Sequence, residues 1–207
     1  MHPIFRTVLS MTVLGFSAFL SACNREPEPR RYSEVAFRAK SSPMAGQSSI
    51  HLSWTLPKGW VEQPAADPLR LASFLAPDSS ADNSGEMDPK ALDVSIVQLA
   101  GDAGGIPANI SRWMGQVKIP PSPDIVKDLL AKAEPLTVAS GQKGIVIDFT
   151  GLLAGDMTRS TSIIGVILQD TGYTVFVKAK GDLDRLVKLR SQILDFSRSL
   201  SITEEKK

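Results

Sequence analysis

Cysteine and histidine are scarce in this 207-residue chain, which holds one cysteine, Cys23, and two histidines. A single cysteine excludes an internal disulfide, so a domain of this size must be held together by its apolar core. No pair of histidines or cysteines has the spacing of a zinc site, and the scattered carboxylates do not form an oxygen-ligand loop. We therefore expect no metal and no other cofactor.

Excess charge and long apolar runs are lacking as well. The chain has 23 basic and 22 acidic residues, for a formal net charge of +1. Without a strong positive field there is little long-range steering toward phosphate backbones, so we expect no nucleic-acid partner. The apolar run from Val8 to Leu20 is shorter than the roughly 20 residues of a transmembrane helix.

The N-terminus instead has the order of a secretory signal, with Arg6, an apolar run and then small residues. Leu20-Ser21-Ala22-Cys23 resembles the lipobox of bacterial lipoproteins. This resemblance implies that residues 1–22 are a signal peptide and that Cys23 carries diacylglycerol, whose acyl chains, palmitate among them, bind the membrane. An uncleaved anchor with an incidental cysteine is the alternative. Because Asn24 is not the aspartate that retains enterobacterial lipoproteins at the inner membrane, the resemblance implies the periplasmic face of the outer membrane.

The rest of the chain divides into a linker, a domain and a short tail. Residues 23–47 mix charges with proline, serine and glycine, a composition typical of a flexible linker, although its arginines could also touch anionic head groups. Residues 48–203 have the apolar periodicity of a folded domain, and residues 204–207 are a charged tail.

Apolar periodicity predicts the elements of this domain. We expect strands at 50–56, 69–76, 92–99, 145–153, 160–168 and 173–179, and helices at 107–115, 122–133 and 182–200. Ser122 and Asp182 are predicted N-caps, and Pro123 suits a first helical turn. Short turns between strands predict an antiparallel sheet, so the expected class is α+β, with the helices packed on one face of the sheet.

The layout from Trp54 to Leu200 resembles the PsbP/DcrB-like superfamily of extracytoplasmic domains. The residues that carry this likeness are Leu-Pro-Lys-Gly-Trp at 56–60, Arg-Leu-Ala-Ser-Phe at 70–74 and Phe-Ser-Arg-Ser-Leu at 196–200. In addition, Asn-Ile-Ser-Arg-Trp-Met-Gly-Gln at 109–116, followed by Ile-Pro-Pro at 119–121, resembles a segment of uncharacterised bacterial lipoproteins and exported proteins. These resemblances imply an assembly or accessory role and no established activity.

One helical segment carries the candidate binding residues. Asn109, Arg112, Trp113 and Gln116 are spaced at i, i+3, i+4 and i+7 and share a helix face. Polar side chains around a flat indole suit the docking of a partner or a polar ligand. Alternatively, Trp113 packs on the sheet while Arg112 and Gln116 bond to loop carbonyls. Lys178, on the strand before the last helix, is a weaker addition, with an exposed strand face as the alternative.

Signs of catalysis are few. His51 would be the one histidine of the mature chain. Asp93, Asp148 and Asp156 lie on or near strands, but spacing does not bring any two of them together. The loop from Gly101 to Gly105 lacks the Lys-Ser/Thr of a phosphate-binding loop. We expect a non-enzymatic, lipid-anchored protein that binds an envelope partner; a carrier or sensor of a small amphiphilic ligand is the alternative, and an enzyme the third.

Overall fold

The computed structural model describes residues 50–65, 67–78, 88–153 and 160–204. The expected signal peptide, Cys23, the linker to residue 47, Asp156 and residues 205–207 lie outside the described residues. No helix in the described part of the chain has the length and apolar content that a membrane crossing requires.

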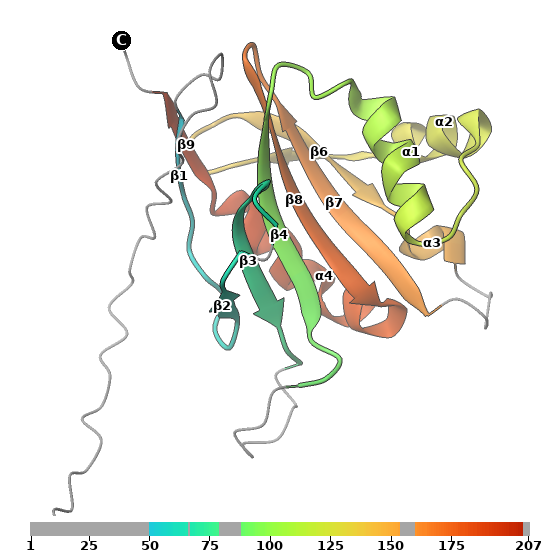
Figure 1. Ribbon diagram of the computed structural model, residues 1–207, viewed down its shortest axis with the longest axis horizontal. Helices are drawn as coiled ribbons and strands as arrows, with labels where there is room; N and C mark the ends of the chain where they lie inside the picture. Colours follow the sequence, from blue (N-terminus) through green and yellow to red (C-terminus); the bar gives the residue numbers. More distant parts are fainter. Residues whose placement is uncertain (1–49, 66, 79–87, 154–159, 205–207) are drawn as a thin grey trace, which may run out of the picture. The chain divides into compact units, whose positions relative to one another are not determined.

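The described domain is built on two antiparallel sheets (Figure 1). The larger sheet has seven strands in the order β2-β3-β4-β8-β7-β6-β5, and every neighbouring pair is antiparallel. Its strands are β2 (Val61–Gln63), β3 (Arg70–Ala76), β4 (Leu92–Ala100), β5 (Glu134–Thr137), β6 (Lys143–Asp148), β7 (Thr161–Gln169) and β8 (Tyr173–Asp182). The smaller sheet pairs β1 (Ile50–Ser53) with β9 (Ser201–Glu204).

Helices cover both faces of the seven-stranded sheet. The helix α4 (Leu183–Arg198) packs on one face, and α1 (Ile106–Gln116) and α2 (Pro123–Ala131) pack on the other (Figure 1). The α+β class and the antiparallel sheet are confirmed, whereas the prediction of helices on one face is wrong. The strand β7 gives the reason, because Ile163 faces the α1 side and Ile164 the α4 side, and a strand that is apolar on both sides needs two covers.

The two faces carry separate apolar clusters. On the α4 face, Phe74 contacts Trp54 and Phe196 with ring centroids 5.7 and 5.2 Å apart, and Phe196 also contacts Trp60. The strand pair β1–β9 adds Ile50, Leu52 and Ile202 to this cluster. The aromatic packing accounts for the firm attachment of α4 to the sheet.

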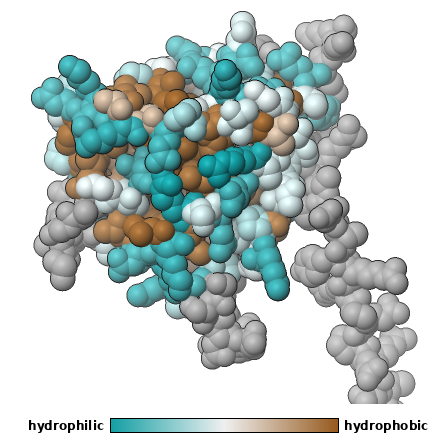
Figure 2. Space-filling view, turned by 180° about the vertical axis from the view of Figure 1, so that it is seen from behind, coloured by the Kyte–Doolittle hydropathy of each residue, from teal (hydrophilic) through white to brown (hydrophobic). Residues whose placement is uncertain are grey.

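The surface seen from the rear of Figure 1 is mixed. Hydrophobic patches lie there between hydrophilic side chains (Figure 2).

Side-chain caps set several element boundaries. The predicted caps are confirmed, since the Asp182 carboxylate accepts the Arg185 N–H at 3.2 Å and Ser122 Oγ accepts the Ile125 N–H. The strand expected at 145–153 ends instead at Asp148, whose carboxylate accepts the N–H and Oγ–H of Thr150 at 2.9 and 2.6 Å. These bonds start the short helix α3 (Thr150–Leu153).

Four short elements had not been predicted. They are β2, β5, α3 and β9. The strand β9 ends at Glu204, which pairs with Ile50, so this residue belongs to a sheet rather than to the expected tail.

Candidate functional site

The helix α1 is joined to the loop that precedes it by a buried amide. Asn109 Nδ2 donates to the carbonyl oxygens of Ala103 and Gly105 at 3.0 and 2.9 Å. Gly105 has a φ of 85°, a conformation that favours glycine, and it forms the N-cap of α1. Asn109 Oδ1 also accepts a hydrogen bond from Arg112 Nη1 at 2.7 Å. Asn109 therefore positions both the loop and the exposed guanidinium of Arg112.

Trp113 lies in the core between α1 and the sheet, with 5% of its surface exposed. Its ring meets Phe176 edge to face, at a centroid distance of 5.9 Å. Gly165 on β7 leaves the space for the indole, because a Cβ at that position would lie 2.2 Å from Cζ3 of Trp113. The packing alternative is confirmed for Trp113. The bonds to loop carbonyls come from Asn109 rather than from Arg112 or Gln116.

Gln116 and Lys178 form a second polar pair beside Trp113. Lys178 Nζ donates to Gln116 Oε1 at 3.0 Å and so joins the last turn of α1 to β8. Burial and then the nearby Arg70 guanidinium lower the pKa of the Lys178 ammonium. The structure thus brings the five predicted residues together as two polar pairs around a buried ring. Their role in binding a partner or ligand stays a prediction.

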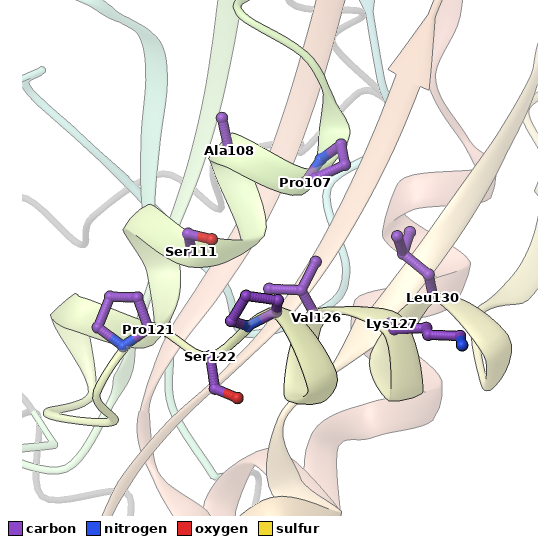
Figure 3. Close-up of a pocket in the computed structure, with 9 residues that line it drawn as sticks. Pro107, Ala108, Ser111, Pro121, Ser122, Val126, Lys127 and Leu130 are labelled. Atoms are coloured by element: carbon purple, nitrogen blue, oxygen red, sulfur yellow. The ribbon is translucent and has the colours of Figure 1, made fainter.

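A separate pocket of about 490 Å³ lies between α1 and α2, and none of the five predicted residues lines it (Figure 3). The sequence analysis did not predict this pocket, although the sequence shows prolines on either side of the connection between the two helices. Its lining consists of Pro107, Ala108, Ser111, Pro121, Ser122, Pro123, Val126, Lys127 and Leu130. The lining belongs to two consecutive helices and the turn between them, so the pocket depends on how α1 and α2 pack.

The chemistry of this pocket is mostly apolar. Pro107, Pro121 and Pro123 present rings whose shape is fixed, so this part of the wall loses little conformational freedom when a ligand binds. The hydroxyl of Ser111 and the ammonium of Lys127 are the polar groups on the helices that could orient a ligand. Its volume lies within the range of small-molecule sites. The pocket can accept an apolar side chain or a short apolar segment with a polar or anionic end.

Of the candidate catalytic residues that the structure describes, Asp93 and Asp148 are held apart. Asp93 on β4 is bound by Arg70, and Asp148 on β6 is bound by Arg190 at 3.0 Å. Two strands, β8 and β7, separate them in the sheet. Among the residues that the structure describes, no group of three or more His, Cys, Asp and Glu side chains is placed to hold a metal ion.

Comparison with known proteins gives a fold likeness and no family. No family model matches the chain, and no curated protein matches it. LpqN, involved in cell envelope biogenesis of Mycobacterium tuberculosis, is 14% identical over 75% of this chain and 85% of its own, with a TM-score of 0.42. The cyanobacterial PsbP of Synechocystis sp. PCC 6803 is 13% identical over 79% of this chain and 98% of its own, with a TM-score of 0.41. Because both TM-scores lie below 0.5, neither likeness assigns a function.

Proposed function

We propose that this chain is a non-enzymatic, lipid-anchored protein on the periplasmic face of the outer membrane, and that it binds an envelope protein through the pocket between α1 and α2. The observation that carries the binding role is this apolar pocket of about 490 Å³ with its proline walls. The lipobox-like Leu20-Ser21-Ala22-Cys23 supports the anchor.

The position of the pocket favours a protein partner over an enclosed ligand. A pocket for a small molecule buries about 70–90% of its ligand, which requires walls on most sides. Here the lining comes from two adjacent helices and their connection, and Ala108 and Lys127 are themselves exposed. One or two apolar side chains of a partner would fill such a pocket, and the surrounding polar residues would form the rim.

Site-specific crosslinking in the native envelope tests this proposal. A photoreactive residue in place of Lys127 should capture one discrete protein, and the additional change Ala108→Arg should reduce the yield about tenfold because its side chain fills the pocket. The matched control is a photoreactive residue in place of Val187, which is 58% exposed on α4, on the opposite face. Equal capture from both positions, or capture that Ala108→Arg leaves unchanged, would contradict the proposal.

The same pocket supports a second candidate function, the binding of a small amphiphile. Its apolar walls and the Lys127 ammonium would suit a short acyl chain with an acidic end. An environment-sensitive apolar probe separates the two functions when it is titrated into the purified protein. Saturable one-to-one binding that Ala108→Arg abolishes, without any captured protein in the envelope, would favour the amphiphile carrier.

The anchor has its own test. Cys23→Ser removes the sulfur to which diacylglycerol would attach, so metabolic labelling with palmitate should be lost and the protein should leave the detergent phase. Mass spectrometry of the parent protein should find an acylated N-terminal Cys23. A parent protein that retains Met1, or a Cys23→Ser variant that partitions like the parent, would show that no lipid is attached there.

A further inference from the structure

Part of the α1 face of the sheet carries none of the described helices. Figure 1 shows α1 and α2 over the β6–β8 side of the sheet, whereas β2 and β3 have no helix in front of them. Residues that pair across antiparallel strands project to the same side. Two cross-strand rows therefore lie on this part of the sheet, which we call the open face: Gln63, Ser73, Ser95 and Lys178 in one row, and Val61, Leu75, Asp93 and Lys180 in the next. Ser73 and Ser95 are themselves buried, at 5% and 1% exposed, so the other six residues supply the accessible surface of the open face.

The first row fixes which side of the sheet this is. Lys178 pairs on its other edge with Gly165, and Gly165 lies beneath Trp113 of α1. The open face is therefore continuous with the surface under α1, and Gln116 marks the border between them through its bond to Lys178.

The cations of the open face outnumber the acids available to them. Arg70 reaches across Ser73 and takes both carboxylate oxygens of Asp93, at 2.7 and 2.8 Å. Lys178 bonds to the neutral amide of Gln116, and Lys180 lies opposite an Asp93 that is already bound. In the described part of the chain neither lysine forms a salt bridge.

The ionisation of Lys178 is consistent with this excess of positive charge. Burial lowers the pKa of its ammonium, and the neighbouring charges of Arg70 and Lys180 lower the pKa further, against the opposing effect of Asp93 and Asp67. A bound anion would relieve the repulsion among the cations.

Exposed apolar side chains accompany these cations. Among the described residues, three large hydrophobic side chains are exposed: Val61 at 52%, Leu69 at 56% and Val187 at 58%. Val61 belongs to the second row of the open face, and Leu69 directly precedes Arg70. Val187 lies on α4, on the other side of the sheet. Basic side chains next to exposed apolar ones are the combination that interfacial proteins present to anionic bilayers.

We propose that the open face, together with the adjoining turn that carries Leu69, docks on a lipid bilayer with anionic phospholipid head groups, with Lys178 and Lys180 against the phosphates and Val61 and Leu69 among the head groups. The lipid on Cys23 would hold the domain within reach, because Ile50 lies 27 positions after Cys23 and this length of chain spans at most about 90 Å. The docking itself does not rest on the α1–α2 pocket, which contributes none of these four residues.

Vesicle binding tests the docking in the absence of the acyl chains. The full mature chain with Cys23→Ser should co-sediment with vesicles of phosphatidylglycerol and phosphatidylcholine, and added salt should weaken the binding because it screens the charges. Lys178→Gln combined with Lys180→Gln should lower the partition coefficient about tenfold. Leu69→Ser should lower it about threefold, because a smaller apolar area enters the interface. Vesicles of phosphatidylcholine alone should bind weakly in every case.

A matched control separates a specific face from total charge. Lys58→Gln with Lys143→Gln removes the same charge from exposed positions outside the open face, and its binding should equal that of the parent. Equal losses in both double variants, or equal binding to vesicles with and without phosphatidylglycerol, would overturn the proposal. Displacement of the vesicles by millimolar glycerol 1-phosphate would also overturn it in favour of a soluble phosphate ligand.

A second variant that leaves Lys178 in place keeps the test decisive if this residue cannot be replaced without unfolding. In that case Lys180→Gln with Leu69→Ser is compared with the same control, and thermal melting confirms that each variant is folded. Retained vesicle binding by this folded variant would overturn the docking proposal, while the crosslink from Lys127 would be unaffected by either result.

Discussion

The two faces of the seven-stranded sheet differ in how completely they are covered. The α4 face has one long helix, a second small sheet and an aromatic cluster around Phe74. The α1 face has two shorter helices over β6–β8 and leaves polar and charged side chains of β3, β4 and β8 without a described helix above them. We infer that the α4 face supplies most of the stability, and that the α1 face can expose binding chemistry because its residues are less needed for the core.

Ion pairs strengthen the attachment of α4. Arg185 Nη1 lies 3.3 Å from Asp78 and 2.9 Å from Asp88, and Lys188 also binds Asp78. Hydrogen bonds from the backbone N–H groups of Lys90 and Asp78, together with Arg185, keep the pKa of Asp88 below its usual value despite burial. The chain that leaves β3 and the chain that enters β4 are thus both tied to α4.

The largest effect is expected from removal of an aromatic ring on the α4 face. Phe196→Ala should lower the free energy of unfolding by about 3–5 kcal/mol, because Phe196 is 1% exposed and its loss leaves a cavity between Phe74 and Trp60. Chemical denaturation measures this change. A loss below about 1 kcal/mol would mean that this face does not dominate the stability.

An intermediate effect is expected where α1 meets the sheet. Gly165→Ala should cost about 1–3 kcal/mol, because the new methyl group would collide with the indole of Trp113. The matched control is Gly115→Ala in α1, where a Cβ meets no atom within 4 Å, and it should be neutral or slightly stabilising. Hydrogen exchange should show loss of protection in α1 with α4 unchanged; equal loss in both helices would remove the distinction between the faces.

The smallest effect concerns alkaline pH. Burial and the nearby Asp170 raise the pKa of Tyr173 to about 12 from an ordinary value of 10.0. The folded state therefore holds the phenolic proton of Tyr173 more tightly than the unfolded state does. The contribution of this proton to the free energy of unfolding is complete below pH 10 and is lost as the pH rises to about 12. At about pH 11 the loss is about 1 kcal/mol, and Tyr173→Phe should not show it. Thermal melting of both proteins between about pH 9 and pH 12 measures this difference. If the melting temperature falls equally steeply with pH in both proteins, the prediction is wrong.

Local patterns predicted the elements that have strong local causes. Ser122 and Asp182 cap their helices because a short polar side chain meets free N–H groups, which needs no distant partner. The alternation in β1 likewise follows from burial of one side. The two-sided apolar content of β7, with Ile163 and Ile164 adjacent, could also have indicated cover on both faces.

Elements that depend on distant partners escaped prediction. The strands β2, β5 and β9 have three or four residues each, and their pairing partners rather than their own periodicity define them. For the candidate site, helical spacing grouped Asn109, Arg112, Trp113 and Gln116 on one face of α1, and in the structure Asn109 and Trp113 are buried whereas Arg112 and Gln116 are exposed. It could not show that this face meets Gly165, because that contact joins residues about fifty positions apart in the chain.

The pairing of Ile50 with Glu204 places both ends of the described domain at one corner. A short loop could therefore join these ends, and new termini could be opened at an exposed turn such as the one at Gly141. In such a circular permutant the tether would begin at a different corner. The attachment point to the membrane thus becomes an experimental variable, independent of the surface chemistry.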